Sequence, residues 1–275
     1  FMTDTAKLAD VVLPACSSYE RSELKFYPEK RIFWTRPAIE PLGQSHSDAE
    51  IIFDLAETLA LDDDLLRGGY EASVDWILKP SGFKVAELKQ YPRGLVVDDV
   101  SIPSYRKYEK NGFKTPSGKM EFTSCVLADH GLDSLPVYRE PMLSPISTPE
   151  AAQNFPLILT TGARLPFFIH SRAYRVPQLR RLQPEPMADV NPADARERDL
   201  SQGDWVLLST SLGAVRVRAN LTETVPPGVV NMYHGRPEAD VNTLIDPDYR
   251  DPISGFPAFK SLLCEVKKAP ETGAA

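Results

Sequence analysis

The sequence has few cysteines, and none of them lies in a metal-binding pattern. Cys16, Cys125 and Cys264 are far apart along the 275-residue chain, and no C-x-x-C pair is present. Zinc and iron–sulfur sites need clustered cysteines, so this chain by itself offers neither kind of site. We expect three buried free thiols. No apolar run approaches the roughly 20 residues of a transmembrane helix, so we also expect no direct membrane span.

The sequence also lacks an excess of positive charge. Acidic residues number 38 against 31 basic ones, which gives a formal net charge of −7. Nucleic-acid binding needs a basic face, so we expect no nucleic-acid partner. The chain begins Phe1-Met2-Thr3 without a signal-peptide pattern. We therefore expect a fragment or the second half of a longer protein, whose compartment, cytoplasmic or periplasmic, stays open.

One stretch is locally free of acidic residues, from Ala151 to Pro184. It opens with the apolar run Leu157–Leu159, which predicts a buried strand. Hydroxyl, backbone and cationic donors follow this strand: Thr160, Thr161, Gly162, Arg164, His170, Ser171, Arg172 and Arg175. Such donors suit an anion such as a pyrophosphate. On spacing alone, a β-hairpin with a solvated basic loop explains the pattern equally well.

The first half of the chain predicts short elements joined by loops, as the 25 prolines indicate. Ser47-Asp-Ala-Glu50 is a capping box, so an amphipathic helix should cover about residues 47–60. The other expected elements are a helix over 3–8, a buried strand at Ala9–Pro14, an irregular loop over 17–36, a helix near 71–78, and a turn at 116–118 followed by a strand. Four prolines between Pro136 and Pro149 mark the expected domain boundary.

The second half predicts a small closed β-barrel. Turn signals separate short β-rich runs at 157–159, 205–209, 214–221, 228–232 and 262–266. Asn191 and Pro192 predict the start of one short helix. Arg216 and Arg218 alternate with apolar residues on one strand face, and we expect that face to be solvated.

Several of these segments together resemble the molybdopterin oxidoreductases of the DMSO reductase family. Residues 2–14 (MTDTAKLADVVLP) and 112–121 (GFKTPSGKME) resemble the end of the family's third domain and the segment that leads out of it. Three loops resemble the family's dinucleotide contacts in order and spacing: Thr161-Gly162…Arg164…His170-Ser171, Val241-Asn242-Thr-Leu244, and Phe259-Lys260. The first loop is most similar to the acetylene-hydratase-like and thiosulfate-reductase-like branches. The loop after residue 14 departs from the family pattern.

The resemblance implies a fold, a domain division and a cofactor. Residues 1–145 would be an α/β remnant of a Rossmann-like domain, and residues 146–275 a six-stranded double-psi β-barrel. The cofactor would be bis(molybdopterin guanine dinucleotide) with molybdenum or tungsten, bound by Thr160, Thr161, Gly162, Arg164, His170, Ser171, Arg172, His234, Asn242, Phe259 and Lys260. No residue is assigned as catalytic or as a metal ligand, and Cys16 is rejected as a ligand because it lies in the wrong segment.

The implied function is that of the C-terminal part of a molybdenum or tungsten oxidoreductase performing two-electron chemistry on a small substrate. In a hydratase-like member the metal would act as a Lewis acid instead. The implied partners are the N-terminal remainder, which would carry the iron–sulfur cluster, and an iron–sulfur electron-transfer subunit. Two alternatives stay open: a non-catalytic chain that carries or matures the pterin cofactor, and an assembly subunit whose loops no longer bind it.

Overall fold

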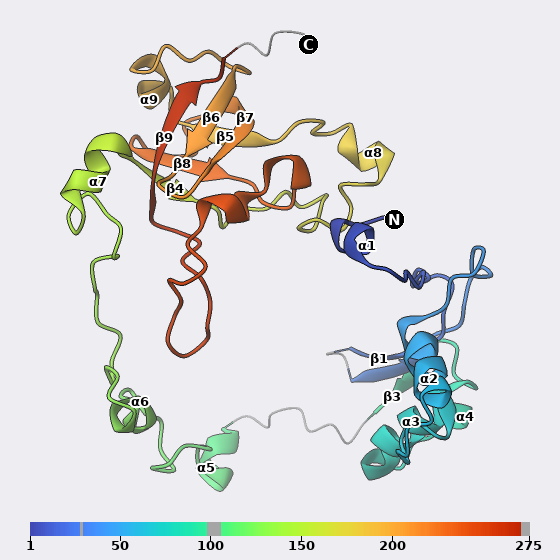
Figure 1. The fold of residues 1–275 in the computed structure, drawn as a ribbon. Coiled ribbons are helices and arrows are strands. Elements are labelled where there is room, and N and C mark those ends of the chain that lie inside the picture. The colour runs from blue at the N-terminus through green and yellow to red at the C-terminus, as the bar shows by residue number, and fades with distance from the viewer. Residues whose placement is uncertain (28–29, 98–105, 271–275) are drawn as a thin grey trace. The chain divides into compact units, whose positions relative to one another are not determined.

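A computed structural model describes residues 1–27, 30–97 and 106–270. The chain forms two compact units, Met2–Ser124 and Cys125–Ala275, with Phe1 assigned to the second (Figure 1). The predicted boundary between residues 145 and 146 stays a prediction. Among the helices within the described ranges, none is long and apolar enough to cross a membrane.

The first unit is a small α/β structure built on an antiparallel sheet. Its elements are α1 (Asp4–Leu8), β1 (Leu24–Tyr27), β2 (Arg31–Trp34), α2 (Asp48–Thr58), α3 (Gly69–Leu78), the 3₁₀ helix η1 (Lys79–Ser81), α4 (Val85–Leu88), β3 (Leu95–Val96) and α5 (Lys107–Asn111). The strands pair in the order β1-β2-β3. The core comprises Ile32, Trp34, Val74, Leu78, Val85 and Leu88.

Helix α2 confirms the predicted capping box. The Ser47 hydroxyl accepts a hydrogen bond from the Glu50 amide, and the Glu50 carboxylate accepts one from the Ser47 amide. These bonds satisfy amide donors that the first helical turn leaves open, and they lower the pKa of Glu50. Part of the apolar surface of the helix is uncovered, however, because Ile52 and Leu59 remain 56% and 67% exposed, whereas Ala56 is buried.

Three predicted features of the first unit are wrong, and one thiol prediction fails in the second. Ala9–Pro14 forms no strand, and Val11 is 74% exposed, because the run pairs with no sheet among the described residues. The expected loop at 17–36 contains the β1–β2 hairpin. The turn at 116–118 forms, but no strand follows it. All three cysteines are free and two are buried, whereas Cys125 is exposed at the start of a helix.

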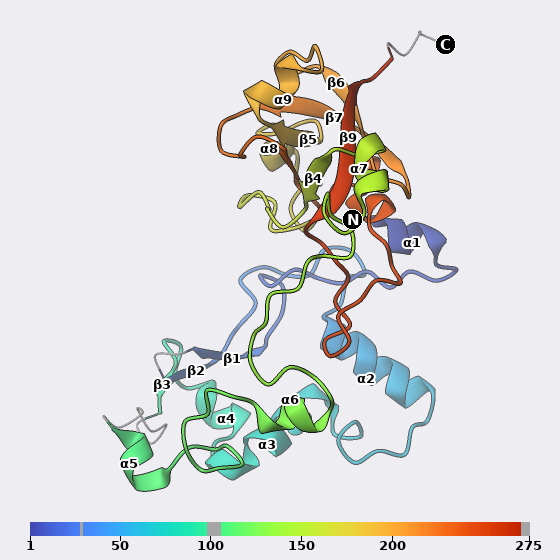
Figure 2. The ribbon, with the colours of Figure 1, turned by 90° about the vertical axis from the view of Figure 1, so that its left-hand side faces the viewer.

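The second unit contains the predicted closed six-stranded barrel (Figures 1 and 2). Its strands are β4 (Leu157–Thr160), β5 (Met187–Val190), β6 (Trp205–Ser209), β7 (Ala214–Leu221), β8 (Val229–Met232) and β9 (Leu262–Lys268). They close in the order β4-β8-β5-β7-β6-β9, with parallel and antiparallel pairs. Its helices are α6 (Cys125–Asp129), α7 (Pro149–Asn154), α8 (Pro177–Arg180), α9 (Pro192–Arg196), η2 (Pro237–Ala239) and η3 (Val241–Leu244).

Alternation along the strands fills the barrel. In β7, Val215, Val217 and Ala219 are buried inside, while Arg216 and Arg218 lie on the other face. That face is more than solvated surface, because both guanidinium groups lie against the Trp205 ring, at 4.5 and 4.2 Å from its centroid.

Strand β5 was not predicted. It has four residues, and Asp189 interrupts its apolar pattern. Asp189 is only 3% exposed, and its carboxylate accepts hydrogen bonds from the amides of Asn220 at 2.7 Å and Asn231 at 2.9 Å. Burial, followed by a hydrogen bond to Asp189 and the charge of that carboxylate, raises the pKa of the Tyr233 hydroxyl to about 12. The polar cluster therefore makes a short strand with a buried carboxylate stable.

Candidate functional site

The strand register brings three loops to one end of the barrel. Strand β4 pairs in parallel with β8, where Thr160 lies opposite Asn231, and antiparallel with β9, where Leu159 lies opposite Leu262. Three segments must therefore meet: the residues that follow β4 (the β4 loop), those that follow β8 (the β8 loop) and those that precede β9 (the β9 loop). These are the places where Thr161, His234 and Lys260 stand in the sequence.

Contacts between the β4 and β9 loops begin at Thr161, which is 4% exposed. Its amide and its hydroxyl both donate to the Phe259 carbonyl oxygen, at 3.1 and 2.8 Å. The next residue, Gly162, lies against the Lys260 side chain. A Cβ atom at position 162 would stand 2.8 Å from Lys260 Cε. The small residue thus lets the lysine lie across the backbone of the β4 loop.

A chain of hydrogen bonds joins the β4 and β8 loops. Arg164 Nη1 lies 2.6 Å from His170 Nε2, and His170 Nδ1 lies 2.7 Å from His234 Nε2. His234 Nδ1 in turn lies 3.2 Å from the backbone carbonyl oxygen of Thr161. Arginine can only donate, and a carbonyl oxygen can only accept. The chain is therefore complete when both imidazoles are neutral and carry their proton on Nδ1, with every donor pointing from Arg164 towards Thr161.

The electrostatics around His170 favour that neutral form. Desolvation, followed by the charges of Arg164, His234 and Arg172, lowers the pKa of His170 from its ordinary value of 6.5. The backbone at His170 is also unusual, since Ile169 and His170 have φ values of +47° and +64°. Left-handed conformations at non-glycine residues persist only where surrounding contacts hold them, and they concentrate at ligand-binding loops.

The close approach of the β8 loop holds this backbone in place. Gly235 has a φ of +93°, and a Cβ there would stand 2.6 Å from the His170 carbonyl oxygen. Only glycine combines that φ with that contact at no cost.

The remaining predicted residues lie at the same end of the barrel with looser connections. Thr160 ends β4, Ser171 and Arg172 are exposed in the β4–β5 loop, and Asn242 is exposed in η3. The Asn242 amide donates to the Asp240 carboxylate at 2.9 Å, so within the described residues no hydrogen bond joins it to the histidine chain. Helix η3 packs on the β6–β7 turn, where the Thr243 oxygen limits the space at Gly213.

Three cationic side chains at this end of the barrel have no carboxylate partner among the described residues. Across residues 1–27, 30–97 and 106–270, neither Arg164, Arg172 nor Lys260 forms a salt bridge. Four other arginines of the same unit are paired with Glu185, Glu238 or Glu265: Arg180, Arg198, Arg218 and Arg236. Cations without a carboxylate partner, beside a glycine and a left-handed backbone, fit a phosphate-bearing ligand. In the same described ranges, His, Cys, Asp and Glu side chains form no group that could hold a metal ion.

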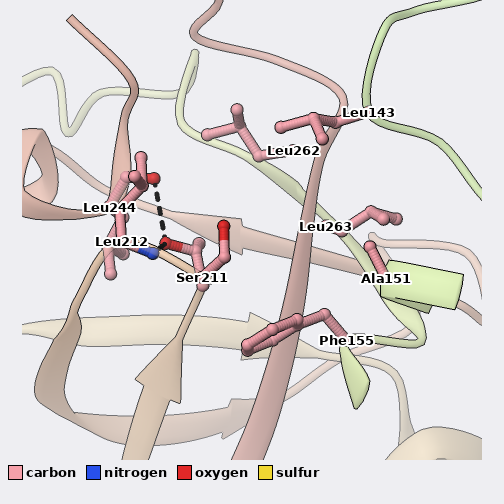
Figure 3. Close-up of a pocket in the computed structure, with 9 residues that line it drawn as sticks. Leu143, Ala151, Phe155, Ser211, Leu212, Leu244, Leu262 and Leu263 are labelled. Carbon is pink, nitrogen blue, oxygen red and sulfur yellow. Dashed lines mark hydrogen bonds between the residues drawn. The ribbon is translucent and has the colours of Figure 1, made fainter. Parts of the chain in front are cut away.

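A pocket on the barrel wall offers different chemistry. Figure 3 shows Leu212 and Leu244 on one side of it and Ala151, Phe155 and Leu263 on the other. The remaining lining residues are Leu143, Thr210, Ser211 and Leu262, and the Thr210 hydroxyl is already bonded to the Leu244 oxygen. No lining residue is charged, and none is a predicted site residue. The pocket therefore does not suit a pyrophosphate.

The fold is a closed six-stranded barrel, and cationic side chains gather at one of its ends. Residues 157–263 match the family model described as the molydopterin dinucleotide binding domain, and residues 1–58 match that of molybdopterin oxidoreductase. The chain belongs to the molybdopterin oxidoreductases of the DMSO reductase family, a family of enzymes, and contains their dinucleotide-binding domain.

Known proteins are similar in sequence to this chain along most of its length. Acetylene hydratase of Syntrophotalea acetylenica is 31% identical over 94% of this chain and 38% of its own length. The F420-dependent formate dehydrogenase subunit alpha of Methanocaldococcus jannaschii is 32% identical over 97% of this chain and 37% of its own length. The solved acetylene hydratase from Pelobacter acetylenicus has a TM-score of 0.83 at 28% identity, covering 98% of this chain and 39% of that one. This chain thus spans about two-fifths of their length.

Sequence reasoning missed two residues that shape the site. One is Gly235, for which the sequence offers a signal, since a glycine directly after His234 is typical of a close backbone approach. Arg236 was not noticed, because nothing in the sequence distinguishes a buried arginine from a surface one.

Proposed function

We propose that this chain grips the dinucleotide tails of a bis(molybdopterin guanine dinucleotide) cofactor as part of a larger molybdenum or tungsten oxidoreductase. The observation that carries the proposal is the set of three carboxylate-free cations, Arg164, Arg172 and Lys260, at one end of a molydopterin-binding barrel. When bound, the metal–dithiolene group supplies two-electron redox chemistry on a small substrate. The residues of this chain hold and orient that group.

Each predicted residue has a role suited to its chemistry. Arg164 and Arg172 bring planar guanidinium donors to pyrophosphate oxygens, and Lys260 adds a compact charge beside the Gly162 backbone. Thr160, Ser171 and the amide of Gly162 donate to oxygens that carry less charge. Thr161 and Phe259 act through the bond between their loops. Asn242 offers an amide for the edge of a guanine ring. His170 and His234 fix the β4 loop as neutral hydrogen-bonding groups, with no role as bases.

The proposed partners follow from the family and from uncovered apolar surface. An N-terminal part would carry the iron–sulfur cluster and the metal ligand, and an iron–sulfur subunit would exchange electrons. Support comes from the exposed faces of the first unit, at Val11, Leu13, Ile52 and Leu59. Several large apolar side chains exposed to water on one unit are typical of an interaction surface.

Metal and pterin analysis of the full-length gene product tests this function. We expect molybdenum or tungsten together with pterin, and guanine nucleotide released by acid in a two-to-one ratio to the metal. Lys260→Ala should lower the nucleotide content, whereas Lys267→Ala should not, because Lys267 is an exposed lysine near the far end of β9, the strand that begins just after Lys260. A product without pterin would refute the proposal. Pterin without metal would favour a cofactor-carrying accessory chain.

A further inference from the structure

Arg236 follows the cluster residue Gly235 and is the most buried arginine of the barrel unit, at 3% exposure. A guanidinium group out of water needs partners for its donors. Arg236 Nη1 donates to the Gln183 oxygen at 2.9 Å, and Nη2 donates to the Pro184 oxygen at 2.6 Å. Nη2 also lies 2.7 Å from a carboxylate oxygen of Glu238. Both backbone partners belong to the end of the β4–β5 loop, residues 161–186.

The same side chain also contacts the middle of this loop. The Arg236 guanidinium carbon lies 5.6 Å from the Phe168 ring centroid and 5.9 Å from that of Tyr174. Both rings are buried, and they bracket His170 and Arg172 in the sequence. One arginine therefore fixes the loop on both sides of its exposed cationic tip, through cation–π contacts to Phe168 before the tip and Tyr174 after it, and it also holds the end of the loop through carbonyl bonds.

Glu238 adds a further contact between the segment after β8 and the β4–β5 loop. Its carboxylate also accepts from Arg180 Nη2 at 3.2 Å, on helix α8 of the same loop. With the His170–His234 bond and the Gly235 approach to His170, the whole segment 234–238 lines the β4–β5 loop. Each of the three guanidinium nitrogens of Arg236 donates to a protein oxygen, and the residue is only 3% exposed, so the side chain is committed to the protein.

We propose that Arg236 is the positioning residue of the cofactor site, holding the β4–β5 loop in the shape that presents Arg164, His170 and Arg172 to the dinucleotide. This inference rests on the proposed function above. Arg236 acts through the loop and does not touch the cofactor. Lysine cannot replace it, because one ammonium group lacks the planar fork that reaches two carbonyls and a carboxylate while stacking on two rings.

The test compares Arg236→Lys with Arg198→Lys in the full-length gene product. Arg198 is a matched control, because it is 14% exposed, pairs with Glu265 and donates to the Asp194 oxygen, without contacting the β4–β5 loop. Glu238→Gln serves as a second, milder variant if Arg236→Lys fails to fold. Three properties are measured: amide hydrogen exchange of residues 164–184, pterin retention during dialysis, and the imidazole ¹⁵N shifts that report the His170 tautomer.

We expect Arg236→Lys to speed exchange in the loop by at least about tenfold, to shorten pterin retention, and to mix the His170 tautomers. Exchange in β6 and β7 should stay as in the wild type, and Arg198→Lys should leave loop, retention and tautomer unchanged. Unchanged loop exchange, or a looser loop with full retention and an unaltered tautomer, would overturn the proposal. If the wild type itself holds no pterin, the proposed function is what fails.

Discussion

Gly162 and Gly235 should differ in how much the same substitution, to alanine, lowers the free energy of unfolding. Replacing Gly162 by alanine puts a Cβ 2.8 Å from Lys260 Cε, the far part of a flexible side chain. The lysine can swing away, so the free energy of unfolding should change by under about 0.5 kcal/mol. The displaced ammonium no longer lies over the loop. Losing a charge-assisted contact of about 1.5–3 kcal/mol should weaken cofactor binding roughly 10- to 150-fold.

Replacing Gly235 by alanine meets backbone instead. The new Cβ would stand 2.6 Å from the His170 oxygen and 2.7 Å from its carbonyl carbon, at a φ of +93°. Neither atom can rotate away, and the left-handed conformation alone costs about 1–2 kcal/mol. We expect at least about 2 kcal/mol of destabilisation, with cofactor loss as its consequence.

The assay is urea unfolding followed by hydrogen exchange of barrel peptides, combined with the pterin content of the purified protein. Similar destabilisation in both variants would refute the argument that Lys260 yields and the His170 backbone does not. Full pterin content in a well-folded Gly162→Ala variant would refute the role of this end of the barrel.

Three further predictions concern single groups. The lowered pKa of His170 means that its stabilising contribution is complete above the ordinary value of 6.5 and is lost as the pH falls through the lowered one. Barrel stability should therefore fall as the pH drops below the ordinary value of 6.5, and less so in His170→Asn, as urea unfolding can measure. Asp189→Asn turns an acceptor for two buried amides partly into a donor, and should lower the free energy of unfolding by about 1–3 kcal/mol in the same assay. Ser47→Ala removes the helix cap and should cost about 1 kcal/mol, seen as faster exchange in α2 with the barrel unchanged.

Local patterns predicted much of the fold because the physics there is local. The Ser47 capping box and the alternating strand 214–221 each specify one element within a few residues. Strand β5 could not be found that way, since its buried Asp189 is stabilised by amides about 30 and 40 residues away. The strand prediction for Ala9–Pro14 failed for a related reason, because an apolar run becomes a strand only beside another strand.

Parts of the candidate site are likewise visible in the local sequence, whereas other parts depend on residues far apart in the chain. The donor-rich loop at 160–172 is visible in the sequence, but its meeting with Phe259 and Lys260 depends on which strands neighbour β4. Only the resemblance to a known family linked these segments in advance. Arg236 was missed because its burial depends on Phe168 and Tyr174, which lie more than 60 residues earlier in the chain.

The most direct test is a structure of the full-length gene product with its bound cofactor. The account predicts pyrophosphate oxygens within hydrogen-bonding distance of Arg164, Lys260 and the backbone at Gly162. A dinucleotide whose phosphates lie elsewhere, with these three residues facing only solvent, would contradict it.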